Sequence, residues 1–389
     1  MNQYLQTVKK SASIELMSKA AQMKKAGVDV ISLAGGEPDF DTPQKIRDKV
    51  VAELSRGNTH YAVGKGLIHL RRAIKQKFKI ENHIDYAEDE ILVTPGGKMA
   101  IYLAVRACIN VGDEVMILNP AWVSYSQIVI ASGGIPVGVK LSSQENYAIT
   151  KEALESYYTE RTKVIIINSP NNPTGRVINQ NEVNTIKEFM EGKDIVIISD
   201  EIYEEIIYED FKHISIASIK ELRNKTITIN GFSKGYAMTG WRMAYMAGDI
   251  SLIDTIYKLY SHTITGTSPF LQEACITAFD CDEDVVRMRN IYHKRRKEFI
   301  SGLNQIERVS AKYPEGTFYA WVKFDIGNMD SFEIANYLLE ETHVIGVPGS
   351  AYGLGSEKYI RFSFANNEKD LKDAVERIEE GIRRLRTTY

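Results

Sequence analysis

Residues 163–200 read KVIIINSPNNPTGRVINQNEVNTIKEFMEGKDIVIISD, and this stretch decides the fold class. Two short, β-branched apolar runs are separated by a loop rich in proline and asparagine and by a segment with helical spacing, NEVNTIKEFMEG. A strand, a crossover helix and a second strand make a βαβ unit, which joins parallel strands. Strands that are apolar along their whole length suit a sheet covered on both faces.

The same pattern extends along the chain in both directions. Further strand-like runs are ILVTP (91–95), EVMILNP (114–120), IPVGVKL (135–141), TITING (226–231) and RMAYMAG (242–248). Nearer the N-terminus, the sequence predicts a helix over 11–26 ended by Gly27, and another that starts at Pro43 with Thr42 as N-cap and ends before Gly57. The fold class is therefore α/β, with a mainly parallel seven-stranded sheet.

The pattern changes near residue 285. A long charged helix over 282–303 is followed by two strand-like runs, GTFYAWVKF (316–324) and KYIRFSFA (358–365), and by a last amphipathic helix. We therefore expect three parts. Residues 1–44 form an N-terminal segment packing with the small domain, residues 45–285 a large domain built on the main sheet, and residues 286–389 a small α+β domain.

Composition narrows the functional class. The 48 basic residues are balanced by 51 acidic ones, which gives no sign of a nucleic-acid-binding surface. The three cysteines form no CxxC pair, and their odd number favours a reducing compartment. No apolar run has the length of a signal peptide core or a membrane span. We expect a cytoplasmic protein with small-molecule substrates and no nucleic-acid or membrane partner.

Polar residues follow directly after several of the apolar runs, where ligands bind in open α/β sheets. They are Gly96, Gly97 and Lys98; Asn171 and Asn172; Asp200 and Tyr203; and Lys234 with Arg242. Taken singly, each fits an ordinary turn or helix cap equally well. Together they suit a ligand with a phosphate, a basic ring nitrogen and an aldehyde, and a lysine Schiff base with an Asp or Arg partner marks pyridoxal 5′-phosphate. We expect no metal ligand among them.

The motifs GEPDF, TPGGK, WVSY, NSPNNPTG, SDEIY, SK and MTGWR occur in this order, followed by the arginine of IRFSFA. In this arrangement the chain resembles the class I aminotransferases of the fold type I pyridoxal phosphate enzymes, most closely the bacterial aspartate aminotransferase branch. The resemblance covers nearly the whole chain. It implies a homodimer with shared active sites.

The resemblance also assigns roles to residues. Lys234, Asp200 and Tyr203 would be catalytic: Lys234 carries the cofactor, Asp200 pairs with its ring nitrogen, and Tyr203 with Asn172 binds its 3-oxygen. The phosphate would be bound by Ser233, Arg242, Gly97, Lys98 and, from the second subunit, Tyr61. Trp122 would stack on the cofactor ring, and Gly36 would close over a substrate whose α-carboxylate is held by Arg361. Trp122 and Asn172 would also contact the substrate.

The implied reaction is a ping-pong transfer of an amino group between an L-amino acid and a 2-oxo acid. Lys98 and Ser11 match positions that bind a distal carboxylate in this branch, which favours aspartate and glutamate with 2-oxoglutarate and oxaloacetate. An aromatic amino acid, kynurenine or prephenate aminotransferase is the alternative. Ala121 and Lys65 depart from the pattern of the branch, and the aromatic residues of GTFYAW fit either a substrate entrance or the core.

Other functional classes lack their required motifs. The loop G-x-x-x-x-G-K-[ST] of phosphate-binding ATPases is absent, because Lys98 is followed by Met99 and Leu92 stands where the first glycine is needed. Neither GKGLIH nor GLGSEK completes the dinucleotide motif G-x-G-x-x-G. A regulator with an aminotransferase-like effector domain would need a separate DNA-binding domain. Lyase or racemase chemistry on the same cofactor stays open at this point.

Overall fold

The computed structural model describes residues 3–8, 12–62 and 64–387. The seven apolar runs form one sheet, whose strands are β2 (Ile91–Thr94), β3 (Glu114–Asn119), β4 (Ile135–Lys140), β5 (Thr162–Asn168), β6 (Val196–Asp200), β7 (Thr226–Gly231) and β8 (Ala244–Ala247). Their order across the sheet is β2-β8-β7-β6-β5-β3-β4. Strand β8 is antiparallel to β2 and β7, whereas the pairs from β7 to β4 are parallel. The predicted mainly parallel, seven-stranded sheet is confirmed.

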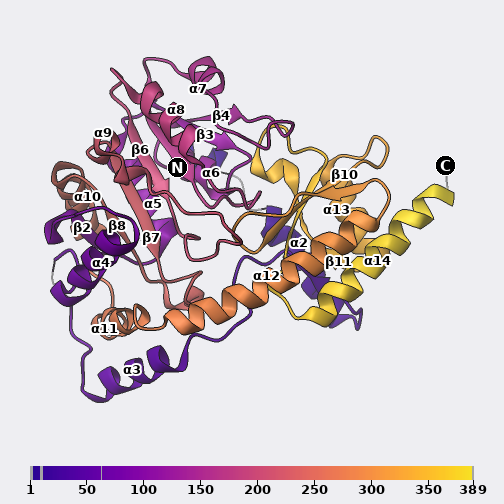
Figure 1. The fold of residues 1–389 in the computed structure, drawn as a ribbon, viewed down its shortest axis with the longest axis horizontal. Coiled ribbons are helices and arrows are strands. Elements are labelled where there is room, and N and C mark those ends of the chain that lie inside the picture. The colour runs from indigo at the N-terminus through magenta and orange to yellow at the C-terminus, as the bar shows by residue number, and fades with distance from the viewer. Residues whose placement is uncertain (1–2, 9–11, 63, 388–389) are drawn as a thin grey trace.

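The helices of the chain alternate with these strands and extend past them (Figure 1). They are α1 (Gln3–Thr7), α2 (Ala12–Lys25), α3 (Gln44–Ser55), α4 (Ile68–Glu81), α5 (Gly97–Cys108), α6 (Ser124–Ala131), α7 (Lys151–Tyr157), α8 (Gln180–Met190), α9 (Lys220–Arg223), α10 (Ile250–Thr263), α11 (Pro269–Ala278), α12 (Asp282–Gln305), α13 (Ser331–Tyr337) and α14 (Glu368–Thr387).

Apolar side chains cover both faces of the large sheet, as the unbroken apolar runs predict. On β5, Val164 and Ile166 join a cluster with α5, α6 and α10, while Ile165 and Ile167 join another with α7 and α8. Alternate residues of a strand point to opposite faces, so these helices lie on opposite faces of the sheet. Burying each such side chain contributes roughly 1.5–3 kcal/mol. This packing fixes the strand ends that carry the polar residues.

A second, four-stranded antiparallel sheet lies beyond the large one, with the order β12-β13-β10-β9. Its strands are β9 (Val309–Ala311), β10 (Tyr319–Phe324), β12 (Val347–Pro348) and β13 (Tyr359–Ser363). Strand β1 (Ile31–Ser32) pairs in parallel with β11 (Val344–Ile345), which brings the N-terminal segment to this part of the chain. The long helix α12 runs from beneath the large sheet to the second one (Figure 1). The domain boundaries at 44 and 285 stay predictions.

One local prediction is wrong. Thr42 does not cap α3, which begins at Gln44 with Pro43 in the N-cap position. The Thr42 hydroxyl instead donates a 2.7 Å hydrogen bond to the carbonyl of Ala237, in the turn that follows Lys234. The Thr42 side chain therefore makes a long-range hydrogen bond instead of the local cap that the sequence pattern predicts. This bond joins the N-terminal segment to the turn that contains Lys234.

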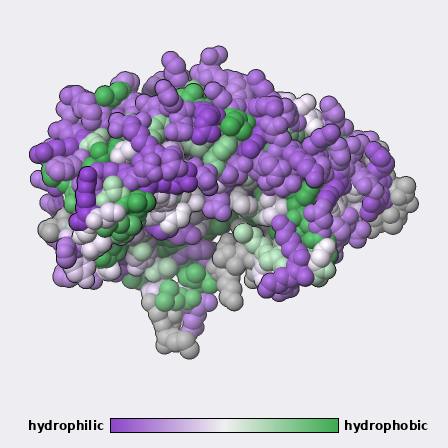
Figure 2. All heavy atoms as spheres, turned by 90° about the horizontal axis from the view of Figure 1, so that it is seen from below, coloured by the Kyte–Doolittle hydropathy of each residue, from purple (hydrophilic) through white to green (hydrophobic). Residues whose placement is uncertain are grey.

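The surface is mixed. On the face shown in Figure 2, hydrophilic residues cover most of the area and hydrophobic residues form separate groups. Among the residues that the structure describes, no helix combines the length and the apolar character needed to cross a bilayer.

Candidate active site

The polar residues predicted for a site meet at the carboxyl edge of the large sheet. Parallel strands β5, β6 and β7 end there side by side, with Asn168 opposite Asp200 and Asp200 opposite Ile229. The structure brings together Gly36, Asn172, Asp200, Tyr203, Lys234 and Arg361, although they come from widely separated parts of the sequence.

Asp200 is the last residue of β6 and is only 5% exposed. The Tyr125 hydroxyl donates a 2.6 Å hydrogen bond to Asp200 Oδ2, and the backbone N–H of Ile202 donates to Oδ1 at 3.3 Å. Burial raises the pKa of Asp200 to about 6, although both hydrogen bonds oppose that rise. The group is thus an oriented carboxylate that is largely ionised at neutral pH.

Lys234 lies in the turn after β7 and points into the same space. Its Nζ donates a hydrogen bond to the carbonyl of Gly36 and lies 5.6 Å from the ring centre of Tyr203. Burial, followed by the positive charges of Arg361 and Arg242, lowers the pKa of this amine to about 8. An appreciable share of the amine is therefore uncharged near neutral pH, as a nucleophile or base requires.

Arg361 approaches the site from β13 and is 5% exposed. Its Nη1 donates to Asn172 Oδ1 at 3.2 Å, and Nη2 donates to the carbonyls of Ala34 and Gly35 at 2.7 and 3.1 Å. The Nε–H is buried and has no partner among the described residues. A buried, unpaired donor on a fixed guanidinium is suited to an anionic ligand such as a carboxylate.

The start of α5 forms a second part of the site. Its N-cap residue, Gly96, offers no side chain to the free backbone N–H groups of the first turn, which include those of Gly97 and Lys98. A Cβ at Gly96 would lie 2.5 Å from Arg242 Nη2, so the glycine lets the guanidinium reach the helix end. An uncapped helix N-terminus beside a guanidinium favours a phosphate group.

Two buried residues with hydroxyl groups lie in the same region. Thr94 ends β2 two positions before Gly96, and its buried hydroxyl has no hydrogen-bond partner in the described part of the chain. Ser233 is buried directly before Lys234. Both are available to a ligand that carries hydrogen-bond acceptors.

The residues predicted to contact the substrate side chain or the partner lie further out. Lys98 is exposed at the surface, and its Nζ lies 5.1 Å from the ring centre of the half-buried Trp122. Partial desolvation of the Lys98 amine, and then the positive charge of Arg242, lowers the pKa of Lys98. Tyr61 is 89% exposed. Ser11 lies outside the described residues. Lys65, one of the departures noted above, is held by Asp254 at 2.6 Å and takes no part in this group.

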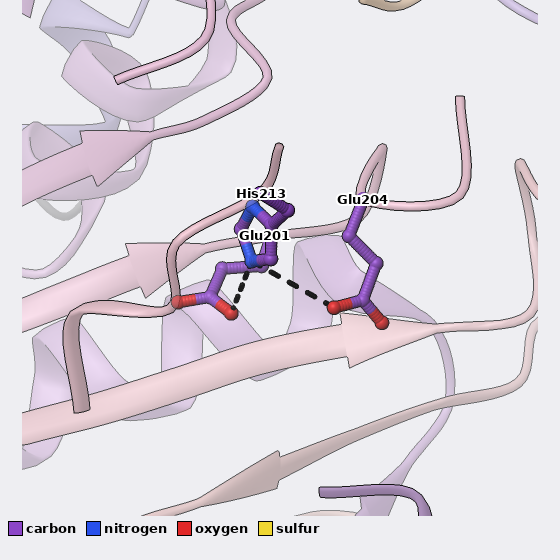
Figure 3. A group of neighbouring side chains, drawn as sticks. All are labelled: Glu201, Glu204 and His213. Atoms are coloured by element: carbon purple, nitrogen blue, oxygen red, sulfur yellow. Dashed lines mark hydrogen bonds and ion pairs between the residues drawn. The ribbon is translucent and has the colours of Figure 1, made fainter. Parts of the chain in front are cut away.

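Glu201, Glu204 and His213 form an ionic network in the segment that directly follows Asp200 (Figure 3). His213 Nε2 is 2.9 Å from Glu201 Oε2 and 3.7 Å from Glu204 Oε2. Burial alone would lower the pKa of His213, but the two carboxylates raise it above its usual value. The three residues have the spacing of a metal-binding group.

Protein donors already fill the carboxylates of this network. Ser199 and Ser215 donate to Glu201 Oε1 at 2.7 and 2.9 Å. Lys77, Asn82 and Asn230 donate to Glu204, and the Lys77 ammonium supplies a positive charge beside it. We therefore interpret the group as a hydrogen-bonded network that ties α4, the loop after β6 and the end of β7 together, and thereby holds the turns that carry Asp200 and Lys234.

Two site residues were missed by the sequence reasoning. Tyr125 of the WVSY motif carries no predicted role, yet it is 2% exposed and bonds directly to Asp200. The sequence pattern places Tyr319 in the core or at an entrance, yet its hydroxyl lies 2.8 Å from the hydroxyl of Tyr203. A usable signal existed for Tyr125, because it stands one helical turn after Trp122 at the start of a helix that faces the sheet edge.

Comparison with known proteins agrees with this geometry. The family model "Aminotransferase class I and II" matches residues 28–378. An aspartate aminotransferase of Bacillus sp. (strain YM-2) is 38% identical over 97% of this chain and 98% of its own, and a probable aspartate/prephenate aminotransferase of Rickettsia conorii is 39% identical over 97% of each. The crystal structure of an aromatic aminotransferase from Pyrococcus horikoshii OT3 matches with a TM-score of 0.89 and 38% identity, over 94% of this chain and all of that one.

Proposed function

The chain belongs to the class I and II aminotransferases, and from that membership we propose that it uses pyridoxal 5′-phosphate to move an amino group between aspartate or glutamate and a 2-oxo acid. It is a transaminase with the fold type I architecture. The observation that supports the proposal most strongly is the meeting of three groups at one sheet edge. These are the Lys234 amine with its lowered pKa, the buried Asp200 carboxylate, and the Arg361 guanidinium with a free Nε–H.

The residues present fit the cofactor. The uncapped start of α5, Arg242, Ser233 and the unpaired Thr94 hydroxyl suit its phosphate group. Lys234 would carry it, Trp122 would lie against its ring, and Asn172 and Tyr203 would bind its 3-oxygen. When bound, pyridoxal phosphate supplies a protonated ring that stabilises negative charge at the substrate Cα and a carbon that accepts the amino group.

The protein's own groups have separate tasks in this proposal. Asp200 keeps a proton on the ring nitrogen opposite it, because a buried carboxylate stabilises an adjacent positive charge. Lys234 would remove the proton from the substrate Cα and deliver it to the cofactor carbon that accepts the amino group, and its pKa of about 8 allows both transfers near neutral pH. Arg361 holds the substrate α-carboxylate as a planar two-pronged donor, which orients the Cα–H bond.

The substrate side chain would be recognised at Lys98. Its ammonium lies beside Trp122 at the open side of the site, where a distal carboxylate of aspartate or glutamate would end. Ser11 would add a hydroxyl to this pocket. The relative named for aspartate and prephenate and the structural neighbour named for aromatic substrates support two alternatives on the same scaffold, prephenate and aromatic amino acids. Kynurenine is a further alternative that rests on the resemblance alone.

We infer a cytoplasmic homodimer built from the three parts predicted above, 1–44, 45–285 and 286–389. Helix α3 exposes Val51 and Leu54 at 64% and 45%, and Tyr61 follows it with its ring almost fully exposed. Exposed apolar groups next to an exposed tyrosine support a subunit interface at this place. Tyr61 would then reach the phosphate site of the second subunit.

One experiment tests the function. The purified protein is loaded with pyridoxal phosphate, mixed with single amino acids, and followed by the absorbance of the bound cofactor. Loss of the visible band with aspartate and glutamate is expected, and the Lys98→Ala variant should lose this preference. A response only to phenylalanine, tyrosine or kynurenine would favour the alternative. No response to any amino acid, or normal turnover by Lys234→Ala, would contradict the proposal.

A further inference from the structure

Tyr319 is a buried residue of β10 that the proposed reaction leaves without a role. It is 1% exposed, and its hydroxyl oxygen lies 2.8 Å from the hydroxyl oxygen of Tyr203. Burial raises the pKa of both phenols, so both keep their protons. A hydroxyl has one donor and two acceptor positions. Either hydroxyl can be the donor in this pair, and when Tyr319 donates to Tyr203, the Tyr203 proton is free to be donated to another acceptor.

The ring of Tyr319 supports Arg361. The guanidinium carbon lies 4.2 Å from the ring centre of Tyr319, nearer than the 5.5 Å that separates it from the ring of Tyr352. A guanidinium held over an aromatic face has less freedom to tilt, and its planar set of N–H groups can then meet a carboxylate in two parallel bonds. Tyr319 thus fixes the plane in which Arg361 offers its donors.

The same hydroxyl also borders the N-terminal segment. A Cβ at Gly36 would lie 3.1 Å from Tyr319 Oη, and the Gly36 carbonyl accepts the hydrogen bond from Lys234. The Tyr319 side chain therefore lies against three residues of the site. They are Gly36, which accepts the hydrogen bond of Lys234, Tyr203 on the cofactor side, and Arg361 on the carboxylate side. Tyr319 lies where the three parts of the site meet.

The backbone before Tyr319 is held in an uncommon conformation. Thr317 has φ = 64°, and its hydroxyl accepts the Tyr319 N–H at 3.2 Å. The Thr317 carbonyl accepts the hydroxyl of Tyr208. A left-handed threonine persists only where its surroundings fix it. The backbone that enters β10, and with it the position of Tyr319, is therefore held in one conformation at a cost in local strain.

We propose that Tyr319 is a positioning residue that couples the carboxylate side of the site to the cofactor side, its hydroxyl orienting Tyr203 and its ring holding Arg361. This rests on the proposed roles of Tyr203 and Arg361. The two effects separate by substitution, because Tyr319→Phe removes the hydroxyl and keeps the ring, whereas Tyr319→Leu removes both.

The test uses the full-length protein loaded with pyridoxal phosphate. The first measurement is the pH at which the absorbance of the bound cofactor is half changed. In Tyr319→Phe this midpoint should rise by about half a pH unit or more, because Tyr203 donates less effectively to the negative 3-oxygen. The second measurement is the dissociation constant of maleate, a dicarboxylate that serves as the probe of Arg361. It is made at a pH well below the midpoints of the unmodified protein and of the Phe variant. Maleate binding should change less than about twofold in the Phe variant and weaken about fivefold or more in the Leu variant.

Tyr86→Phe is the matched control, because Tyr86 is equally buried and the hydroxyl that is removed lies 3.3 Å from Thr228, away from Tyr203, Arg361 and the Thr317 turn. Its midpoint and maleate affinity should equal those of the unmodified protein. A midpoint for Tyr319→Phe equal to that of the unmodified protein would overturn the inference. If Tyr319→Leu has lost its thermal unfolding transition, the Phe variant alone decides. An unmodified protein without a pH-dependent visible band would instead contradict the proposed function.

Discussion

Lys234 combines burial with an ionisable amine, and this combination costs stability before any ligand binds. Its pKa falls to about 8 in the folded protein, whereas an unfolded lysine keeps a value near 10.4. The folded chain therefore holds this proton less tightly than the unfolded chain does. The contribution of Lys234 to the free energy of unfolding is most unfavourable below pH 8, and the penalty disappears as the pH rises from 8 to the pKa of the unfolded lysine.

Replacing Lys234 by Met should consequently stabilise the cofactor-free protein. At pH 7 we expect a gain of about 2–3 kcal/mol in the free energy of unfolding, which shrinks between pH 8 and pH 10.5 because the unmodified lysine is then neutral in both states. Urea denaturation at several pH values measures it. Lys212→Met, at an exposed lysine, is the control. A gain that does not depend on pH would show that apolar packing, not the amine charge, is responsible.

Tyr125 is the nearest hydrogen-bond donor to the Asp200 carboxylate and lowers the pKa of that group. In Tyr125→Phe the pKa of Asp200 should rise above 6, so a larger share of the carboxyl is protonated at pH 7. A hydrogen bond to a charged group is worth about 1.5–3 kcal/mol, so kcat should fall roughly tenfold or more. The acidic limb of the pH profile should move to higher pH.

The control for this variant is Tyr86→Phe. Tyr86 is equally buried, but its hydroxyl lies 3.3 Å from Thr228 on the other side of the sheet core, with no bond to Asp200. Its kcat and pH profile should match those of the unmodified protein. Superimposable profiles for Tyr125→Phe would mean that Asp200 is held by its other contacts.

Helix α5 acts as an element through its first turn. The N-cap residue Gly96 has φ = 88° and lies against Arg242, so any side chain there meets both backbone strain and a steric clash. In Gly96→Ala we expect the guanidinium to be displaced from the helix end, at a strain cost of about 1–3 kcal/mol. The dissociation constant for pyridoxal phosphate, measured by absorbance titration, should rise about tenfold or more.

Gly240→Ala is the matched control for the helix start, because a Cβ at Gly240 meets no atom within 4 Å and the residue lies two positions before Arg242. Its cofactor affinity should be unchanged. Equal affinities for the two variants would place the phosphate away from α5.

At the level of elements, sequence patterns that depend on neighbours along the chain were reliable. The seven apolar runs became the seven strands of one sheet. Six of them are buried along nearly their whole length, as strands covered on both faces should be, whereas the edge strand β4 is more open. Thr42 shows where such reasoning ends. Its residue type suits a helix cap, but its hydroxyl donates a hydrogen bond to the carbonyl of Ala237, which is far away along the chain. Tyr125 and Tyr319 were missed for the same reason, since their partners are set by tertiary packing.

At the scale of the whole molecule, the site is assembled from distant segments. Arg361 of the second sheet bonds to Ala34 and Gly35 of the N-terminal segment and to Asn172 after β5. Each motif could be matched to a role from the sequence by resemblance, but no motif encodes these contacts. A carboxylate bound at Arg361 would therefore act on all three segments at once, because Arg361 belongs to one of them and its guanidinium is bonded to the other two.

Tyr61 extends this argument to a second copy of the chain. It is 89% exposed, which leaves its ring free for a subunit partner. If Tyr61 completes the site of the other subunit, mixing two defective variants restores a complete site. Lys234→Ala lacks the lysine but keeps Tyr61, and Tyr61→Ala keeps the lysine. In a hybrid dimer, the lysine of one subunit meets Tyr61 of the other.

After equal amounts are unfolded and refolded together, about half of the dimers are hybrids and each has one complete site of two. Activity should therefore reach about a quarter of that of the unmodified protein plus about a quarter of the residual activity of Tyr61→Ala, because one site in four is complete and one dimer in four carries only Tyr61→Ala. Each variant refolded alone gives the baseline. Activity equal to the mean of the two baselines would show that Tyr61 serves its own subunit or none, since only a shared site gains from mixing.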